Sequence, residues 1–248
     1  MAEHNGRWDL GSIAFKAKQD GNAWRLDGEK DYVIDGQIAD IVLVAAKAGN
    51  GLALFEVEGG AANGLQREAL PTLDLTRKLA KLTLAGTSAT RVSGPGDVSR
   101  GLEHVLAFAA AMLAAEQLGG AQRCLEMSTE YAKTRLQFGR PIGSFQAIKH
   151  KCADLLVETE FARSAAYNAA FAATGDTEKE FIEAAHAAKA YCSEAFFHAA
   201  AENIQIHGGM GFTWEHPAHL YFKRARSSSI LFGDPLEHRQ KLAAQLLL

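Results

Sequence analysis

The sequence contains few cysteines, with only Cys124, Cys152 and Cys192 among 248 residues. Their separations match no metal-binding pattern, and an odd number of isolated thiols is typical of proteins from a reducing compartment. We therefore expect neither a disulfide framework nor a thiolate-ligated metal centre. The nine histidines show no ligand spacing either, so no metal site is predicted.

The sequence also lacks the marks of exported, membrane-bound and nucleic-acid-binding proteins. It opens with no signal peptide and contains no uninterrupted apolar run of transmembrane length. The formal net charge is only −3, from 26 basic and 29 acidic residues. This balance argues against a general nucleic-acid-binding surface. We expect a cytoplasmic protein that binds neither nucleic acid nor a membrane.

What is present is an ordinary globular composition, 48% hydrophobic and 22% charged, sufficient for one or two domains with their own cores. Residues 1–96 hold short runs of β-forming residues, separated by Asp, Gly and Asn. This spacing predicts a small β-barrel or β-sandwich domain. The expected strands are Ser12–Lys18, Asn22–Leu26, Tyr32–Ile34, Ile41–Ala46, Leu52–Val57 and Leu82–Leu84.

Residues 97–248, which follow the break Gly94-Pro95-Gly96, are rich in alanine and helical in pattern. Helices of this kind pack closely, so the segment predicts an antiparallel domain resembling a four-helix bundle, and the whole chain is of the α+β class. The expected helices are Leu102–Gln137 (loosened at Gly119-Gly120), Ser144–Ala173, Thr177–Ile206, Trp214–Arg226 and Asp234–Leu247. Thr177, with Glu180 three residues later, and Asp234 are the expected N-caps.

The stretch Ala201–Phe212, AENIQIHGGMGF, is the most unusual local sequence. Glycines are used where the backbone takes a positive φ or approaches another group closely, and exposed backbone N–H groups in such a turn can bind an anion such as a diphosphate. A helix end followed by a turn explains the same letters. Composition alone favours the simpler explanation.

An upstream segment, Tyr131–Gln146 (YAKTRLQFGRPIGSFQ), changes this balance. Together the two segments resemble the C-terminal helical domain of the acyl-CoA dehydrogenase family. In that family an R-x-x-F-G segment followed by F-Q lies against FAD, and a Q-I-x-G-G-x-G-[FY] segment holds the FAD pyrophosphate. The resemblance therefore implies FAD-binding roles for Arg135, Phe138, Gln146, Gln205, Gly208 and Gly209.

The front of the chain resembles the middle β-domain of the same family. The matching stretches are GNAWRLDGEKDYVIDGQIADIVLV, residues 21–44, and LDLTRKLAKLTL, Leu73–Leu84. Family members carry an additional helical domain before this β-domain, and the chain opens inside the segment that resembles the start of the β-domain. That domain helps to cover the acyl pocket, so substrate binding by this chain alone is in doubt.

The resemblance implies α,β-dehydrogenation of an acyl-CoA thioester, as in fatty-acid or steroid side-chain degradation, with electron-transfer flavoprotein as the electron acceptor. A carboxylate removes the α-proton, and it stands at one of two family positions. These positions hold Phe232 and Ala109 here, and neither side chain accepts a proton. The family's Trp-x-Thr pattern near the flavin reads Tyr32-Val33-Ile34, so a hydroxyl is also lost.

In the family's dimers each FAD lies across a subunit interface, and the neighbour supplies the Arg, Phe, Gln and Gly-Gly groups. This chain keeps that set and lacks the base. It therefore resembles the base-less subunit type of heteromeric acyl-CoA dehydrogenases from actinobacterial steroid- and lipid-degrading systems. We expect it to assemble with a homologous subunit, in a hetero- or homo-oligomer that is a dimer or a tetramer.

Two alternatives remain open at this point. Glu116 lies on the same face of the predicted helix as Ala109, among apolar neighbours that can raise its pKa, and it is a weak candidate for an unusual base in a self-sufficient enzyme. A helix carboxylate bonded to a neighbouring helix explains Glu116 more simply. The other alternative is a non-enzymatic flavoprotein of the same fold.

Overall fold

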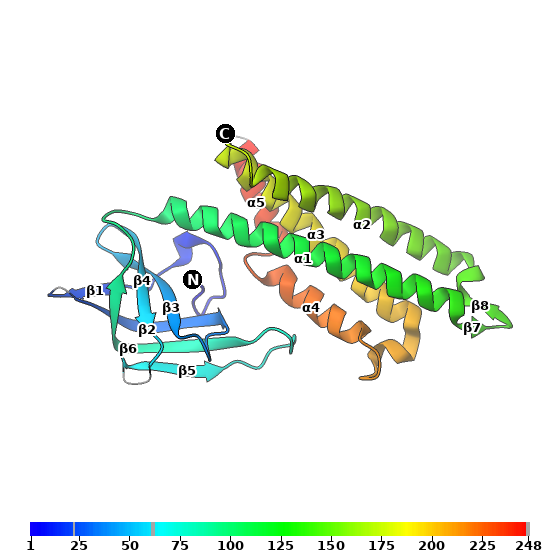
Figure 1. The fold of residues 1–248 in the computed structure, drawn as a ribbon, viewed down its shortest axis with the longest axis horizontal. Coiled ribbons are helices and arrows are strands. Elements are labelled where there is room, and N and C mark those ends of the chain that lie inside the picture. Colours follow the sequence, from blue (N-terminus) through cyan, green and yellow to red (C-terminus); the bar gives the residue numbers. More distant parts are fainter. Residues whose placement is uncertain (22, 61–62, 247–248) are drawn as a thin grey trace. The chain divides into compact units, whose positions relative to one another are not determined.

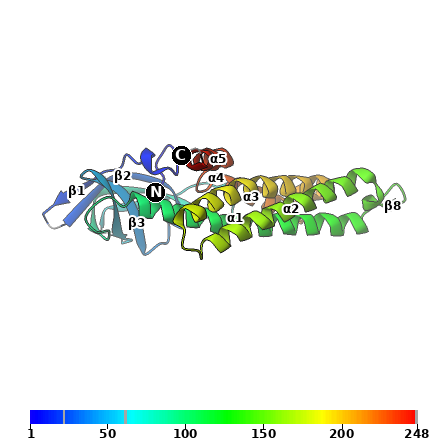
Figure 2. The same ribbon diagram turned by 90° about the horizontal axis from the view of Figure 1, so that it is seen from above.

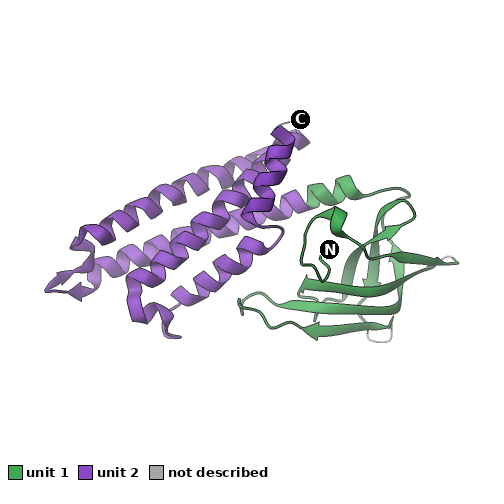
Figure 3. Cartoon of the chain, turned by 180° about the vertical axis from the view of Figure 1, so that it is seen from behind, with its two compact units in different colours: residues 1–105 green, residues 106–248 purple. Residues whose placement is uncertain are grey.

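The computed structural model describes residues 1–21, 23–60 and 63–246. It divides the chain into two compact units, Met1–Val105 (unit 1) and Leu106–Leu248 (unit 2), shown in Figure 3. The domain boundary expected after residue 96 falls just before the first long helix, whereas the compact units divide within that helix.

Unit 1 is an antiparallel β-structure with a short 3-10 helix, Leu10–Ser12, near its start. Its strands are β1 (Ala17–Asp20), β2 (Ala23–Ile34), β3 (Ile41–Ala48), β4 (Gly51–Glu58), β5 (Leu65–Ala69) and β6 (Leu79–Arg91). The order is β1-β2-β6-β4-β3, and β5 pairs with β6. A parallel bridge between Lys16 and Lys47 connects the segment before β1 to β3, so the order returns to its start as in a small barrel.

The apolar side chains of these strands form one core, in which Leu26, Phe55 and Leu82 are fully buried. The predicted strand Ser12–Lys18 is largely wrong, because its first residue ends the 3-10 helix and β1 begins only at Ala17. Strand β5 is absent from the predictions, because only Leu65 of its five residues is buried and alternation is not visible. The predicted strand Asn22–Leu26 falls within β2 from residue 23 onward, and Asn22 lies outside the described residues.

Unit 2 is a helical bundle, as predicted. Its helices are α1 (Ser99–Thr134, whose first turns belong to unit 1), α2 (Gln146–Ala172), α3 (Glu178–His207), α4 (Ala218–Ile230) and α5 (Pro235–Leu246). A small hairpin, β7 (Leu136–Gln137) and β8 (Arg140–Pro141), and the 3-10 turn Ile142–Ser144 connect α1 to α2. The 3-10 helix η4, Gly208–Phe212, follows α3 directly. Figures 1 and 2 show α1–α4 running side by side.

Small side chains set the close spacing of these helices. Buried alanines of α1, α2 and α3 form a continuous seam. An added Cβ at Gly120 lies 2.4 Å from the Phe196 ring, so only glycine lets α3 approach α1 there. Helix α1 is continuous through Gly119 and Gly120, and the predicted loosening is therefore wrong.

The two predicted caps have different outcomes. Asp234 precedes α5 and accepts the Glu237 N–H at 2.8 Å, while the Glu237 carboxylate accepts the Asp234 N–H at 3.2 Å. This reciprocal pair confirms Asp234 as an N-cap. Thr177 precedes α3, but its side chain makes no capping hydrogen bond, so the predicted pairing with Glu180 is wrong.

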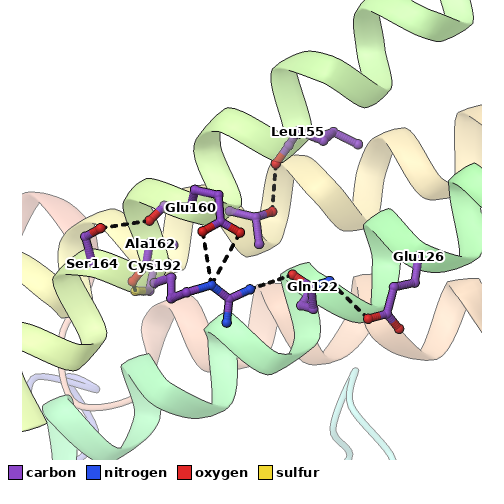
Figure 4. Close-up of polar contacts among 9 residues, drawn as sticks. Gln122, Glu126, Leu155, Glu160, Ala162, Ser164 and Cys192 are labelled. Atoms are coloured by element: carbon purple, nitrogen blue, oxygen red, sulfur yellow. Dashed lines mark hydrogen bonds and ion pairs between the residues drawn. The ribbon is translucent and has the colours of Figure 1, made fainter.

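Polar side chains also tie the helices together. The Arg163 guanidinium of α2 donates to Glu160 on its own helix and, at 2.8 Å, to Gln122 of α1. Figure 4 shows this bridge, with Gln122 bonded in turn to Glu126. Such partly exposed contacts stabilise the helix pair by modest amounts.

Helix α1 bears on the expectation that no uninterrupted apolar run of transmembrane length exists, and this expectation stands, because its uninterrupted apolar run covers only residues 105–115, between His104 and Glu116. Among the described residues, it is long and apolar enough by length and composition, with a mean hydropathy of 1.2 over 18 residues. Since 44% of that window is buried inside the protein and a core helix passes the same test, this is weak evidence for membrane insertion.

Candidate functional site

The hairpin between α1 and α2 projects an aromatic side chain into solvent. Its two-residue turn consists of Phe138 (φ 54°) and Gly139 (φ 76°), the pair of positive φ values that defines a type I′ turn. A bulky residue with positive φ is uncommon. Phe138 is nonetheless 90% exposed, so the turn displays this ring rather than packing it.

Cationic and amide side chains stand on the segments that flank this hairpin. Arg135 follows α1 directly, its backbone is held by hydrogen bonds to Tyr131 and Ile142, and its side chain is exposed. Gln146 is the first residue of α2 and is also exposed. The Arg140 guanidinium, which sequence reasoning did not single out, lies 4.2 Å from the centre of the Phe145 ring.

The glycine segment begins where α3 ends. Gly208 has φ 60°, and its N–H donates to the last carbonyls of the helix, so the simpler explanation as a helix end holds for this residue. Beside Gly208 and Gly209, nothing lies within 4 Å of the place a Cβ would take. Gly211 is different, because its Cβ would lie 3.0 Å from the Ile204 backbone. The requirement for positive φ therefore applies to Gly208 and not to Gly209, while Gly209 leaves an open surface beside exposed Gln205.

A column of three stacked rings joins the hairpin side to the glycine segment. Tyr131 near the end of α1 stacks on His207 at 4.3 Å, and His207 packs against His216 at 4.2 Å. His207 Nδ1–H donates to the Asn203 carbonyl at 2.8 Å, and burial lowers the His207 pKa, which keeps the ring neutral. One signal in the sequence could have pointed to this column, because His207 directly precedes Gly208.

The structure thus brings the predicted residues Arg135, Phe138, Gln146, Gln205, Gly208 and Gly209 to one end of unit 2 (Figure 1). Their side chains and backbone provide a guanidinium, two primary amides, an aromatic face and an unobstructed glycine surface. Guanidinium and backbone N–H groups are the usual donors to phosphate oxygens. This donor set fits a ligand with a diphosphate and a planar ring.

A second site of interest is the turn between α4 and α5, where Phe232 (φ 63°) and Gly233 (φ 107°) both have positive φ. Buried donors hold its carbonyls. Lys189 of α3 donates to the Gly233 carbonyl at 2.9 Å and to the Ser229 carbonyl at 3.1 Å. His238 Nε2–H donates to the Phe232 carbonyl at 3.1 Å. None of these contacts was predicted, since the Lys189 bonds join residues 40 and 44 positions apart and the His238 bond depends on how the turn folds against α5.

The alternative carboxylate, Glu116, lies on α1 and is fixed by an arginine. Both oxygens of Glu116 accept from Arg224 of α4, at 2.8 and 2.9 Å. Glu116 is exposed rather than enclosed by apolar neighbours, which corrects the expectation about its surroundings. The ion pair agrees with the simpler explanation of Glu116 as a helix carboxylate bonded to a neighbouring helix. A catalytic role for Glu116 stays a prediction.

In unit 1, the segment Tyr32-Val33-Ile34 ends strand β2. Tyr32 has φ 57° beside a register shift between Lys30 and Val33, and both Tyr32 and Ile34 are partly exposed. The strand therefore presents an aromatic and an aliphatic side chain, and no hydroxyl at position 34.

Comparison with known proteins identifies the family to which the chain is similar. Residues 100–247 match the family model described as acyl-CoA dehydrogenase, C-terminal domain. The chain is 43% identical over 218 residues to the acyl-CoA dehydrogenase IpdE2 of Mycobacterium tuberculosis, covering 88% of this chain and 61% of that protein. The chain thus spans about three fifths of the length of this curated relative.

Two solved structures of two-component enzymes are also similar. The Tcur3481-Tcur3483 steroid ACAD is 32% identical with a TM-score of 0.84, covering 96% of this chain and 64% of that one. The ChsE4-ChsE5 complex of Mycobacterium tuberculosis is 31% identical with a TM-score of 0.85, covering 97% and 65%.

Proposed function

The chain belongs to the acyl-CoA dehydrogenase family, and from this premise we propose that it is the base-less subunit of an FAD-dependent acyl-CoA dehydrogenase. In this proposal it completes the FAD site of a homologous subunit that carries the catalytic carboxylate. The observation that carries the proposal is the cluster at one end of unit 2, where Arg135, Gln146 and Gln205 are all exposed around the open Gly208-Gly209 surface.

This cluster binds and orients rather than reacts. Arg135 donates to the FAD diphosphate, the two amides donate to neighbouring oxygens, and Gly209 allows close approach of the backbone. Phe138, already exposed on its turn, covers a planar ring without a rearrangement of the hairpin. When bound, FAD accepts the hydride from the β-carbon of the acyl-CoA.

The α-proton has no acceptor at the usual positions of this chain. Phe232 and Ala109 are apolar, and Glu116 is committed to Arg224. A general base contributes about 10²–10⁴-fold in rate. The base therefore comes from the partner, and neither a self-sufficient enzyme nor a non-enzymatic flavoprotein is favoured by a specific contact.

The assembly and its acceptor follow from the same proposal. The similar Tcur3481-Tcur3483 and ChsE4-ChsE5 structures each name two components, and the first is called a steroid ACAD. We propose a heteromeric dimer or tetramer in the cytoplasm that oxidises a fatty or steroid side-chain acyl-CoA. Electron-transfer flavoprotein takes the electrons from the reduced flavin.

Co-expression with a base-bearing homologue from the same source tests this assignment. We expect the two chains to purify together with FAD bound, and the flavin to be lost when either chain is produced alone. Flavin per complex is measured from its visible absorbance after denaturation. Stable FAD binding by a homo-oligomer of this chain, with no gain from any homologous subunit, would overturn the proposal.

A further inference from the structure

We propose that Lys189 is a positioning residue whose ammonium group, enclosed by three oxygen acceptors, fixes the turn Leu231–Asp234 and holds Phe232 in its left-handed conformation. The turn connects α4 to α5. It corresponds to the position of the family's base, so this inference deepens the proposed function and rests on it for its catalytic meaning.

The geometry around Lys189 matches an ammonium group. The side chain is 0% exposed. Its Nζ donates to the Ser193 hydroxyl at 3.1 Å, the Ser229 carbonyl at 3.1 Å and the Gly233 carbonyl at 2.9 Å. An ammonium has three N–H donors and no acceptor, so all three donors are satisfied. A neutral amine has only two, and one acceptor then faces a lone pair.

A network extends this contact to the rest of the bundle. Ser193 Oγ also accepts from Gln117 of α1 at 3.0 Å, and Gln117 donates to Ser228 of α4 at 3.2 Å. These side chains are fully or almost fully buried. Lys189 is thus connected to α1 through Ser193 and Gln117, and it bonds directly to α4. The packing of α1, α3 and α4 therefore fixes the position of its ammonium group relative to the turn.

A second buried donor acts on the same turn from α5. His238 Nε2–H is committed to the Phe232 carbonyl, so in the neutral ring Nδ1 is the acceptor. His186 of α3 then supplies its Nδ1–H to His238 Nδ1 at 2.9 Å. The turn is therefore held through Ser229, Phe232 and Gly233 by side chains of two other helices.

The turn itself needs such support. Phe232 and Gly233 both have positive φ, and for a bulky residue this conformation is costly. The side chain at position 232 makes none of the three carbonyl bonds. Support from Lys189 and His238 is therefore independent of which side chain stands at position 232. The chain thus retains a rigid turn at the position of the family's base, although that position holds Phe232.

The charges around Lys189 determine how the frame responds to pH. Burial lowers the Lys189 pKa to about 8, against the opposing effects of Asp234, Cys192 and Glu237. His238 lies near Lys189, and Lys241 lies near His238 and His186; burial lowers the pKa of His186 to about 4 and that of His238 to about 3, which keeps both rings neutral. Above the midpoint pH of the Lys189 titration, the turn loses one hydrogen-bond donor. The chemical shifts of the turn amides therefore change with the same midpoint pH.

NMR titration of the full chain, with ¹³Cε-labelled lysine and ¹⁵N amides, tests the proposal without flavin or partner. We expect one lysine to titrate near pH 8 and the amides of Phe232, Gly233 and Asp234 to follow its midpoint. In Lys189→Met this transition disappears and the turn amides exchange at least tenfold faster, whereas Lys241→Met, which removes a nearby charge from α5, leaves both unchanged.

If Lys189→Met does not fold, Ser193→Ala replaces it, because this variant removes one acceptor and is expected to shift the lysine midpoint downward together with that of the turn amides. Turn amides that do not follow the lysine, or that keep their exchange rates in Lys189→Met, would overturn the proposal. Because the NMR experiment contains neither FAD nor a partner, its failure would not bear on the proposed function. Conversely, failure of this chain to copurify with a homologous subunit would not bear on the positioning role of Lys189.

Discussion

At the scale of single residues, replacing Arg135 is the strongest test of the proposed FAD-binding cluster at one end of unit 2. A hydrogen bond to a charged group contributes about 1.5–3 kcal/mol, so Arg135→Ala should weaken flavin retention by roughly one to two decades. Arg123→Ala is the matched control, because Arg123 is an exposed arginine of α1 whose guanidinium pairs with Glu126 at the surface. Flavin affinity of the assembled complex is the measurement, and equal affinity in both variants would remove Arg135 from the site.

The glycines separate ligand contact from folding. Gly209→Val places a branched side chain in open space, so we expect a folded protein with little flavin. Gly211→Val instead meets the Ile204 backbone 3.0 Å from its Cβ, so we expect a loss of thermal stability before any specific flavin defect. Melting temperature and flavin occupancy are measured together. Full flavin occupancy in Gly209→Val would show that the glycine segment after α3 serves only to end that helix.

Glu116 tests the alternative base. Glu116→Gln keeps shape and one acceptor for Arg224 while removing the negative charge. In the assembled complex we expect turnover within about threefold of the unmodified protein, because the partner supplies the base. A fall of roughly a hundredfold or more with flavin content and stability unchanged, the size of a lost general base, would make Glu116 catalytic.

At the scale of elements, the buried His186–His238 pair links α3 to α5 and predicts a dependence of stability on pH. Burial lowers the pKa of both rings from the ordinary 6.5, so below that value the unfolded chain binds protons that the folded chain does not. The pair's contribution is therefore complete at neutral pH and is lost as pH falls below 6.5. Each unit of pKa shift corresponds to about 1.4 kcal/mol, so a loss on the order of 1 kcal/mol or more is expected.

Urea unfolding at a series of pH values measures this effect. His186→Gln retains an amide donor for His238 but does not titrate, so it should flatten the acid limb of the stability curve. His198→Gln changes an exposed histidine of the same helix and should not. Identical curves for the two variants would show that the buried pair does not control acid stability.

The sequence predicted well those elements whose patterns lie within a few neighbouring residues. The long helices of unit 2 and the Asp234 cap follow from patterns spanning a few residues. Strand β5 and the capping role of Thr177 were misjudged, because burial on one face and side-chain rotation depend on neighbours distant in the chain. The same limit applies to the site: the FAD motif residues were identified by resemblance, while Arg140, the Tyr131–His207–His216 column and the Lys189 contacts depend on tertiary structure.

At the scale of the whole molecule, the proposed FAD site shared between subunits explains why a chain can keep binding residues and yet hold Phe232 and Ala109 at the two usual positions of the base. In an FAD site shared between subunits, the two tasks belong to different chains, and losing the base from one is tolerated if the other retains it. The exposed Phe138 and the unobstructed Gly208-Gly209 surface suit such a shared site, because a ligand and a partner cover them only on assembly.

Anaerobic reduction of bound flavin by an acyl-CoA shows which chain supplies the base, with bleaching of the visible flavin band as the signal. The complex of this chain with a base-bearing homologue is predicted to bleach, and to stop bleaching when the partner's carboxylate is replaced by its amide. This chain alone, with FAD added in excess, is predicted not to bleach the flavin with any acyl-CoA. Bleaching by this chain alone, or a complex whose activity survives loss of the partner's carboxylate, would contradict the account.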